Sequence, residues 1–352
     1  MQTRRDFVRT VARASFGAFV VQAVPAKRRE VSLGKKRVKV VDVHGHFIFP
    51  EELDVIKGTK LAPNITDNLN RAQPLVLGPQ RIQFMDQQGI DIQVLSHQGG
   101  WWYETDRDLG RQIIKVQNEK LSGWCKANPD RFVGIASVAL QHPEMAADQL
   151  DEAVKKLGLK GVGIQGHVGE EVPSTPKYDP FWTKAQELGV VVFVHPQNAT
   201  NIVKDGALGD FGNVIGNPLE TTYFLSRMIF DGTLDRFPNL KICGAHAGGF
   251  LPSYLGRTDV GCSTRQIAHC NNKRPLREYF KQQILVDSMV FSDEGLRHLV
   301  AELGASQVVY GTDIPYGWPA TVDLIANATF LKDAEKEAIL GGNLMKLLRI
   351  GS

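Results

Sequence analysis

The stretch Val40-Val41-Asp42-Val43-His44-Gly45-His46 is the part of the sequence that decides the fold prediction. Its apolar, β-branched beginning is typical of a buried strand. Residues i and i+2 of a strand point to the same side, so His44 and His46 can direct both imidazoles at one point. The stretch therefore predicts a strand that ends in a pair of metal ligands. Two incidental surface histidines are the alternative until other strand ends are considered.

Seven further apolar runs follow, each separated from the next by a segment long enough for a helix. We expect the eight strands at residues 40–46, 90–96, 132–140, 160–165, 190–196, 240–246, 283–287 and 308–313. The expected helices are 80–88, 106–126, 143–157, 180–188, 218–230 and 319–348. Alternation of strands that are apolar on both faces with helices indicates an α/β fold, a (β/α)8 TIM barrel spanning residues 40–352.

Three of these later strands also end in residues that bind metals. His195, His246 and Asp313 close the fifth, sixth and eighth strands. In such barrels the site lies at the carboxyl ends of the strands, where the following loops meet. Imidazoles and a carboxylate suit Zn²⁺ or Mn²⁺. The strand ends together predict a metal centre on one rim of the barrel.

The first 26 residues have the pattern of an export signal rather than of a folded domain. Thr3-Arg4-Arg5-Asp6-Phe7-Val8 is a twin-arginine motif, and an uncharged run of small and apolar residues follows to Ala26. We therefore expect a Tat signal peptide at 1–26, with cleavage near Ala23 or Ala26. The uncharged run is shorter than the roughly 20 residues of a membrane-spanning helix, so the mature protein is expected to have no membrane span.

The charge balance argues against a nucleic-acid partner. The formal net charge of the whole chain is +3, and four arginines with one aspartate in the export signal account for all of it. A second basic stretch, 27–39, precedes an acidic remainder, and we interpret it as a solvated linker. A single basic segment lacks the extended positive face that nucleic-acid binding requires.

Four cysteines, Cys125, Cys243, Cys262 and Cys270, lack the paired spacing of a structural zinc site. Export would permit a disulfide, for which Cys262 and Cys270 are the most plausible pair, while reduced buried thiols are an equal alternative.

Four motifs carry a resemblance to a known family. They are Asp42-Val43-His44-Gly45-His46, Val194-His195-Pro196, the segment 244–249 (Gly-Ala-His-Ala-Gly-Gly) and the segment 310–315 (Tyr-Gly-Thr-Asp-Ile-Pro). Over residues 38–350 the chain resembles the amidohydrolase superfamily. Within it, the chain is similar to the branch that contains α-amino-β-carboxymuconate-ε-semialdehyde decarboxylase and the γ-resorcylate and 5-carboxyvanillate decarboxylases.

The resemblance implies a role for each rim residue. One divalent metal, Zn²⁺ in the first place with Mn²⁺ as the alternative, would be held by His44, His46, His195 and Asp313. His246 would be the unligated acid/base, since an ordinary histidine exchanges protons near neutrality. Arg257 resembles an arginine that reaches a neighbouring subunit's site, which implies a homodimer. Asp287 would assist proton transfer or organise the loops.

The function that these features predict is a metal-dependent, non-oxidative decarboxylase of an aromatic or unsaturated carboxylic acid. The first rival is a hydrolase that uses the same centre to activate water against an amide, lactone or C–C bond. The second is an inactive metal-binding subunit of a larger complex. Having His rather than Glu at position 44 favours the carboxymuconate-semialdehyde type. Loops 47–79 and 97–105 select the substrate, and Trp101, Trp102 and Tyr103 either line the pocket or pack against helices.

Overall fold

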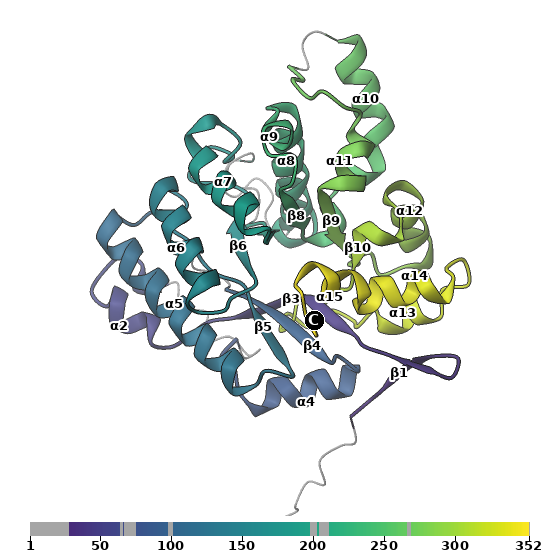
Figure 1. Ribbon diagram of the computed structural model, residues 1–352, viewed down its shortest axis with the longest axis horizontal. Helices are drawn as coiled ribbons and strands as arrows, with labels where there is room; N and C mark the ends of the chain where they lie inside the picture. Colours follow the sequence, from purple (N-terminus) through teal and green to yellow (C-terminus); the bar gives the residue numbers. More distant parts are fainter. Residues whose placement is uncertain are drawn as a thin grey trace, which may run out of the picture.

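A closed barrel of eight parallel strands forms the centre of the molecule. The computed structural model describes residues 28–63, 66, 75–97, 101–197, 203, 211–265 and 269–351. In this part of the chain the barrel strands are β3 (Val41–Phe47), β4 (Ile92–His97), β5 (Phe132–Gly134), β6 (Gly161–Gln165), β7 (Val191–His195), β8 (Lys241–Gly244), β9 (Ile284–Asp287) and β10 (Val308–Val309). They pair in chain order as two sheets, β3 to β5 and β6 to β10 (Figure 1).

Two seams join these sheets into a barrel. Ala136, just beyond β5, forms a parallel bridge with Val162 of β6, and Gly45 of β3 forms one with Ile314, just beyond β10. At the second seam the backbone N–H of His46 donates to the carbonyl of Ile314 at 2.8 Å. The chain therefore has the predicted (β/α)8 architecture.

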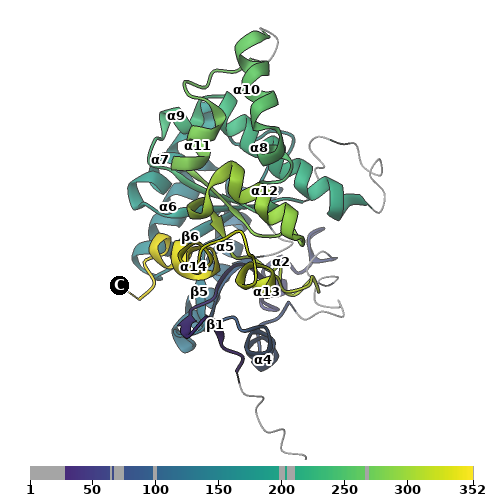
Figure 2. The same cartoon turned by 90° about the vertical axis from the view of Figure 1, so that its right-hand side faces the viewer.

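Helices surround the barrel and mostly follow the strands that precede them (Figures 1 and 2). Their bounds are α2 (Glu52–Ile56), α4 (Pro79–Gln88), α5 (Arg107–Ala127), α6 (Pro143–Lys155), α7 (Asp179–Leu188), α8 (Asn217–Phe230), α9 (Thr233–Arg236), α10 (Leu255–Thr264), α11 (Leu276–Gln282), α12 (Asp293–Leu303), α13 (Val322–Ala326), α14 (Asp333–Glu337) and α15 (Asn343–Leu347). None of the helices described is both long enough and apolar enough to cross a membrane.

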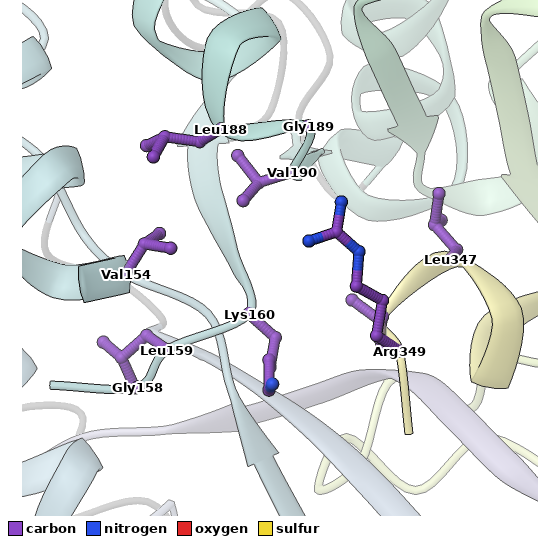
Figure 3. Close-up of a pocket in the computed structure, with 10 residues that line it drawn as sticks. Val154, Gly158, Leu159, Lys160, Leu188, Gly189, Val190, Leu347 and Arg349 are labelled. Atoms are coloured by element: carbon purple, nitrogen blue, oxygen red, sulfur yellow. The ribbon is translucent and has the colours of Figure 1, made fainter. Parts of the chain in front are cut away.

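Apolar side chains fill the interior of the barrel below the rim. Val43, Ile92 and Phe193 belong to this buried cluster, and Leu344 and Leu348 from the C-terminal helical segment join it. The C-terminal segment thus closes the amino-terminal end of the strands. A cavity of about 100 Å³ beside Lys160, Leu347 and Arg349 lies at this end, away from the predicted metal ligands (Figure 3).

The third strand is shorter than the sequence predicts, ending at Gly134 instead of residue 140. Beyond it, a side chain of α5 takes over the backbone groups that a strand would pair. Asn118 accepts a hydrogen bond from the N–H of Ser137 at 2.8 Å and donates to its carbonyl at 3.0 Å. Because an amide side chain offers both a donor and an acceptor, Ser137 is satisfied without a strand partner.

The predicted solvated linker at 27–39 is wrong for the residues described. Here β1 (Val31–Leu33) and β2 (Lys36–Val38) form an antiparallel hairpin. Val31, Leu33 and Val38 are buried in the main apolar core. Arg28 and Arg37 both form ion pairs with Asp91, at the start of β4. The hairpin is therefore part of the folded barrel, because burial of its alternate apolar residues stabilises it.

Candidate metal centre

Four predicted ligands from three parts of the barrel rim converge on one point. The ligand atoms of His44, His46, His195 and Asp313 all lie within 4.8 Å of one another, and all four residues are buried. Oδ1 of Asp313 lies 3.0 Å from Nε2 of His46 and 3.3 Å from Nε2 of His44. The convergence of the two β3 histidines, inferred from their i, i+2 spacing, is thus confirmed.

The polar atoms at this point lack other partners. Nε2 of His44, Nε2 of His46, both ring nitrogens of His195 and Oδ1 of Asp313 are buried without a hydrogen bond to any described residue. Leaving several such atoms unpaired would be costly, so a cluster of them that faces inward fits a bound cation. Three imidazoles and one carboxylate are ligands of a divalent ion with an open position, the arrangement of catalytic sites.

Local backbone geometry places His44 among these ligands. The pairing of β3 with β4 shifts register between Asp42 and Gly45, which is a β-bulge. Gly45 has no room for a side chain: a Cβ there would lie 2.4 Å from Cδ of Gln93. The glycine between the histidines therefore leaves room for the Gln93 side chain, which is held by Asp42 and Arg81.

A buried polar network lies behind the ligands, and the sequence did not reveal it. Asp42 accepts hydrogen bonds from the N–H of His44 at 3.0 Å and from the hydroxyl of Thr312 at 2.7 Å. Gln93 donates to Asp42 at 2.8 Å and accepts from Arg81 at 2.9 Å. Arg81 also donates to the carbonyl of His46 at 2.7 Å. Asp42 and Thr312, which lie in two of the four motifs, were the available signals, and Arg81 had none.

Asp287 organises two parts of the site. Its Oδ2 accepts a hydrogen bond from Nδ1 of His44 at 2.8 Å and from the N–H of His246 at 3.0 Å, while Oδ1 accepts from the N–H of Ala247 at 2.7 Å. His246 and Ala247 have φ values of 53° and 57°, in the left-handed region. Such a turn is strained for residues other than glycine, and the Asp287 carboxylate satisfies its amides. All these contacts support the organising role over proton transfer.

The charges at the site favour a cation. Burial alone would lower the pKa of His44, but the charges of Asp313 and Asp287 raise it to about 10. Burial lowers the pKa of His46 to about 4 and holds that of His195 well below its usual value. Burial opposes ionisation of Asp313, yet the charge of His44 keeps the pKa of this carboxyl well below its usual range. A metal ion would take the place of the proton that His44 otherwise carries.

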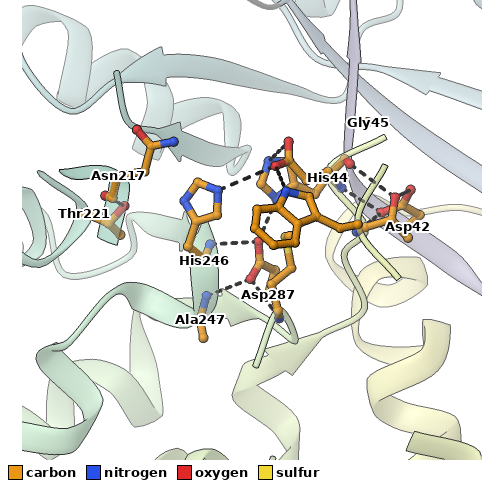
Figure 4. A network of polar contacts seen from close by, with 12 residues as sticks. Asp42, His44, Gly45, Asn217, Thr221, His246, Ala247 and Asp287 are labelled. Carbon is orange, nitrogen blue, oxygen red and sulfur yellow. Dashed lines mark hydrogen bonds and ion pairs between the residues drawn. The ribbon is translucent and has the colours of Figure 1, made fainter. Parts of the chain in front are cut away.

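His246 lies beside the four ligands without being one of them. Its Nε2 is 3.9 Å from Oδ2 of Asp313, and its side chain is 12% exposed, against 3% for Asp313 and 0% for His44. In Figure 4 its ring lies between Asp287 and the α8 residues Asn217 and Thr221. An imidazole that is next to the metal position yet open to the mouth of the barrel is suited to exchanging protons with a substrate.

Arg257 is not brought to this site within the chain. It is exposed on α10 and makes no hydrogen bond or ion pair with the residues described. Helix α10 projects from the body of the molecule at the end opposite β1 (Figures 1 and 2). Its predicted role at a neighbouring subunit's site stays a prediction.

Two further buried histidines, His167 and His97, have structural partners. His167 is buried and contacts Glu220 at 2.9 Å. His97 at the end of β4 contacts both carboxylate oxygens of Glu52 at 2.8 Å. Both pairs fix the loops around the rim.

The barrel and its four-ligand centre define a metal-dependent (β/α)8 enzyme, and His246 lies beside the ligands. The family model described as amidohydrolase matches residues 41–350, so the chain belongs to the amidohydrolase family.

Its relatives include several decarboxylases. The chain is 32% identical over 277 residues to 2-amino-3-carboxymuconate-6-semialdehyde decarboxylase of Dictyostelium discoideum, covering 76% of this chain and 75% of the relative. It is 29% identical over 286 residues to γ-resorcylate decarboxylase of Rhodococcus jostii, covering 77% and 86%. Among solved structures, 5-carboxyvanillate decarboxylase from Sphingomonas paucimobilis is 25% identical, with a TM-score of 0.79 and coverage of 89% of this chain and 99% of the other.

Proposed function

We propose that the protein is a metal-dependent, non-oxidative decarboxylase of an aromatic or unsaturated carboxylic acid. The observation that carries the proposal is the four-ligand centre with His246 beside it, on a chain whose relatives named above are decarboxylases. A complete ligand set with an acid/base neighbour speaks against an inactive partner subunit.

The metal is proposed to be Zn²⁺, with Mn²⁺ as the alternative. His44, His46, His195 and Asp313 would hold it. When bound, the ion would supply positive charge that attracts the substrate's carboxylate or a neighbouring oxygen. Histidine-rich sets with one carboxylate suit both ions, so the ligands alone do not choose between them.

The reaction needs a proton at one carbon atom of the substrate. The C–C bond to the carboxylate breaks, CO2 leaves, and the electron pair that stays on the carbon takes up a proton. His246 is placed to deliver it, because its ring is beside Asp313 and partly exposed at the mouth. Its backbone N–H donates to Asp287, which holds the turn that carries His246.

An aromatic residue near the strands that carry the ligands is consistent with a flat, unsaturated substrate. Trp101, from the loop after β4, is buried, and its Cη2 lies 3.6 Å from where a Cβ on Gly163 would be. Ser96, whose Cβ lies 3.5 Å from the same position, contacts Nδ1 of His46 through its hydroxyl at 3.3 Å. Trp101 and Ser96 thus approach the same point on β6, and we propose that the indole offers an aromatic surface for stacking on a flat substrate.

Isotope-labelled product analysis tests the reaction. The purified, metal-loaded protein is incubated in D2O with a panel of hydroxybenzoates and unsaturated acids. We expect release of CO2 and a product with one deuterium at the carbon that lost its carboxylate. Consumption of water with a newly formed carboxylate would instead establish the hydrolase, which uses the same ligands.

A homodimer that exchanges Arg257 between subunits is the proposed assembly. Arg257, Tyr254 and Val260 are exposed side chains on or next to α10, with Tyr254 at 55% and Val260 at 60%. Arginine is suited to holding a carboxylate through two parallel hydrogen bonds.

Active-site complementation tests this exchange. Arg257→Ala and His246→Ala homodimers should each be nearly inactive. Mixing them under conditions that allow subunit exchange should restore part of the activity, because one site of the mixed dimer has both residues. Failure to recover activity in demonstrated mixed dimers would place Arg257 outside the neighbour's site.

Export by the Tat pathway is the proposed localisation. The signal at 1–26 lies outside the described residues. Support comes from its twin-arginine motif and from the disulfide between Cys262 and Cys270, since disulfides persist in oxidising compartments. Changing Arg4 and Arg5 to lysine should block export of a reporter fused to residues 1–40, and unchanged export would reject the Tat reading.

A further inference from the structure

The two oxygens of Asp313 have different surroundings. Oδ1 faces the metal position, 3.0 Å from Nε2 of His46. Oδ2 accepts a hydrogen bond from the indole N–H of Trp318 at 3.0 Å. Trp318 is five residues further along the chain, in the loop after β10, and no sequence pattern predicted a role for it.

A second aromatic residue supports this indole. Phe291, in the loop after β9, stacks on Trp318 with ring centroids 5.2 Å apart and an interplanar angle of 24°. Phe291 has a φ of 52°, in the left-handed region that is strained for a residue with a bulky side chain. Its ring is 40% exposed. Contacts elsewhere must offset this backbone strain, and the stack on Trp318 is one of them.

His246 competes for the same oxygen. Its Nε2 lies 3.9 Å from Oδ2 of Asp313, beyond hydrogen-bond distance, whereas Trp318 is within it. If Oδ2 were free, it would be available either to the metal, giving a carboxylate bound through both oxygens, or to His246 as a fixed partner. The first would occupy a coordination position that the substrate needs, and the second would hold the proton that His246 has to transfer.

We propose that Trp318 is a positioning residue for Asp313. Its indole N–H holds Oδ2 away from the metal, so that Asp313 binds through Oδ1 alone and His246 keeps its proton available. Phe291 holds the indole in place. This inference rests on the proposed function, because it requires a metal at the four ligands.

The test compares three single variants with the unchanged protein. Trp318→Phe keeps an aromatic ring for the stack but removes the N–H donor. Phe291→Leu removes the stack but keeps the donor. Trp124→Phe is the matched control: Trp124 lies on α5, and its indole N–H has no hydrogen-bond partner among the described residues.

Cobalt substitution provides a readout that does not depend on turnover. Each variant is loaded with Co²⁺, its metal content is measured, and its visible absorption is recorded, since these bands weaken as coordination number rises. Trp318→Phe should retain one ion per chain with weaker bands, and kcat should fall about 10- to 100-fold with a smaller change in KM. Phe291→Leu should change both readouts in the same direction but less, and Trp124→Phe should change neither.

The outcomes separate this inference from the proposed function. If the unchanged protein binds no Co²⁺, the metal centre itself fails, and the role of Trp318 fails with it. If the unchanged protein binds Co²⁺ and decarboxylates, but Trp318→Phe has the same spectrum and kcat, only the role of Trp318 is overturned. Should Trp318→Phe not fold, an unchanged spectrum and kcat in Phe291→Leu would overturn the proposed support from the stack.

Discussion

Nδ1 of His44 donates its hydrogen bond to Asp287 across 2.8 Å inside the barrel wall, and both side chains are fully buried. This contact leaves Nε2 of His44 to face the metal position. A carboxylate behind a ligating imidazole fixes the ring's tautomer and increases its basicity.

Asp287→Asn should therefore weaken metal binding by about 10- to 100-fold, because an amide can offer its N–H instead of an acceptor and favour the wrong tautomer of His44. Competition with a coloured chelator measures the change. Asp108→Asn, at an exposed position on α5, is the control. Equal metal affinity in Asp287→Asn and the unchanged protein would contradict the role given to Asp287.

His246→Ala should keep one metal ion per chain and lose turnover by about 10²-fold or more, since a positioned acid/base typically contributes 10²–10⁴-fold. Metal analysis and product formation are measured on the same preparation. A variant with near-normal kcat would remove the proton-transfer role, and one without metal would show that His246 supports the ligands.

Removal of the metal should inactivate and destabilise the protein together. Without the ion, unpaired buried atoms of His46, His195 and Asp313 remain at the centre. A ligand that binds only the folded state stabilises it in proportion to the logarithm of its concentration over Kd. Dialysis against a chelator should thus abolish activity and lower Tm, and added Zn²⁺ or Mn²⁺ should restore both. Full activity in protein that contains far less than one metal ion per chain would contradict the proposed chemistry.

Arg81→Leu should lower the free energy of unfolding by about 2–4 kcal/mol. The change leaves the carbonyl of His46 and the side-chain oxygen of Gln93 buried without this donor, at about 1–3 kcal/mol for each unsatisfied group. Urea unfolding measures it. Arg81→Lys is the informative partner, because a single ammonium cannot reproduce the planar fork that reaches both acceptors. Equal stability of Arg81→Leu and the unchanged protein would show that water replaces the arginine.

The N-terminal hairpin should contribute to stability once the export signal has been removed. A chain that begins at residue 40 loses the buried Val31, Leu33 and Val38 and the ion pairs of Asp91. We expect its urea midpoint to fall well below that of a chain that begins at residue 27. If the two chains had the same urea midpoint, the hairpin would not contribute to stability and the segment would behave as a linker.

The sequence was sufficient for the barrel and for the metal ligands because both depend on local patterns. Val40 to His46 combines an apolar strand with ligands at i and i+2, and the same pattern of strand followed by ligand recurs at His195 and Asp313. Contacts across the barrel depend on register and loop geometry instead. Arg81 was predicted to be on a helix, but its reach to His46 and Gln93 could not be read from its position in the chain.

Loop residues were the least predictable part of the site. Trp318 contacts Asp313 because the loop after β10 turns back, with Asp313 itself at a φ of 59°. Phe291 approaches Trp318 through a similarly unusual conformation. A bulky Phe rarely adopts left-handed backbone, and although Asp does so more readily, the sequence does not show where, since tertiary contacts impose it. The early end of the third strand also depends on a tertiary contact, because the Asn118 side chain replaces a ladder partner there.

The hairpin and the C-terminal segment meet the barrel at the same end, opposite the metal ligands. Arg28 pairs with Asp91 before β4, and Leu348 packs among side chains at the bottom of the barrel. An enzyme attached to a bead or a bilayer through either extremity would therefore turn its open mouth toward the surrounding liquid. Small acids should therefore still reach the metal ligands of a protein that is attached to a surface by either end of its chain.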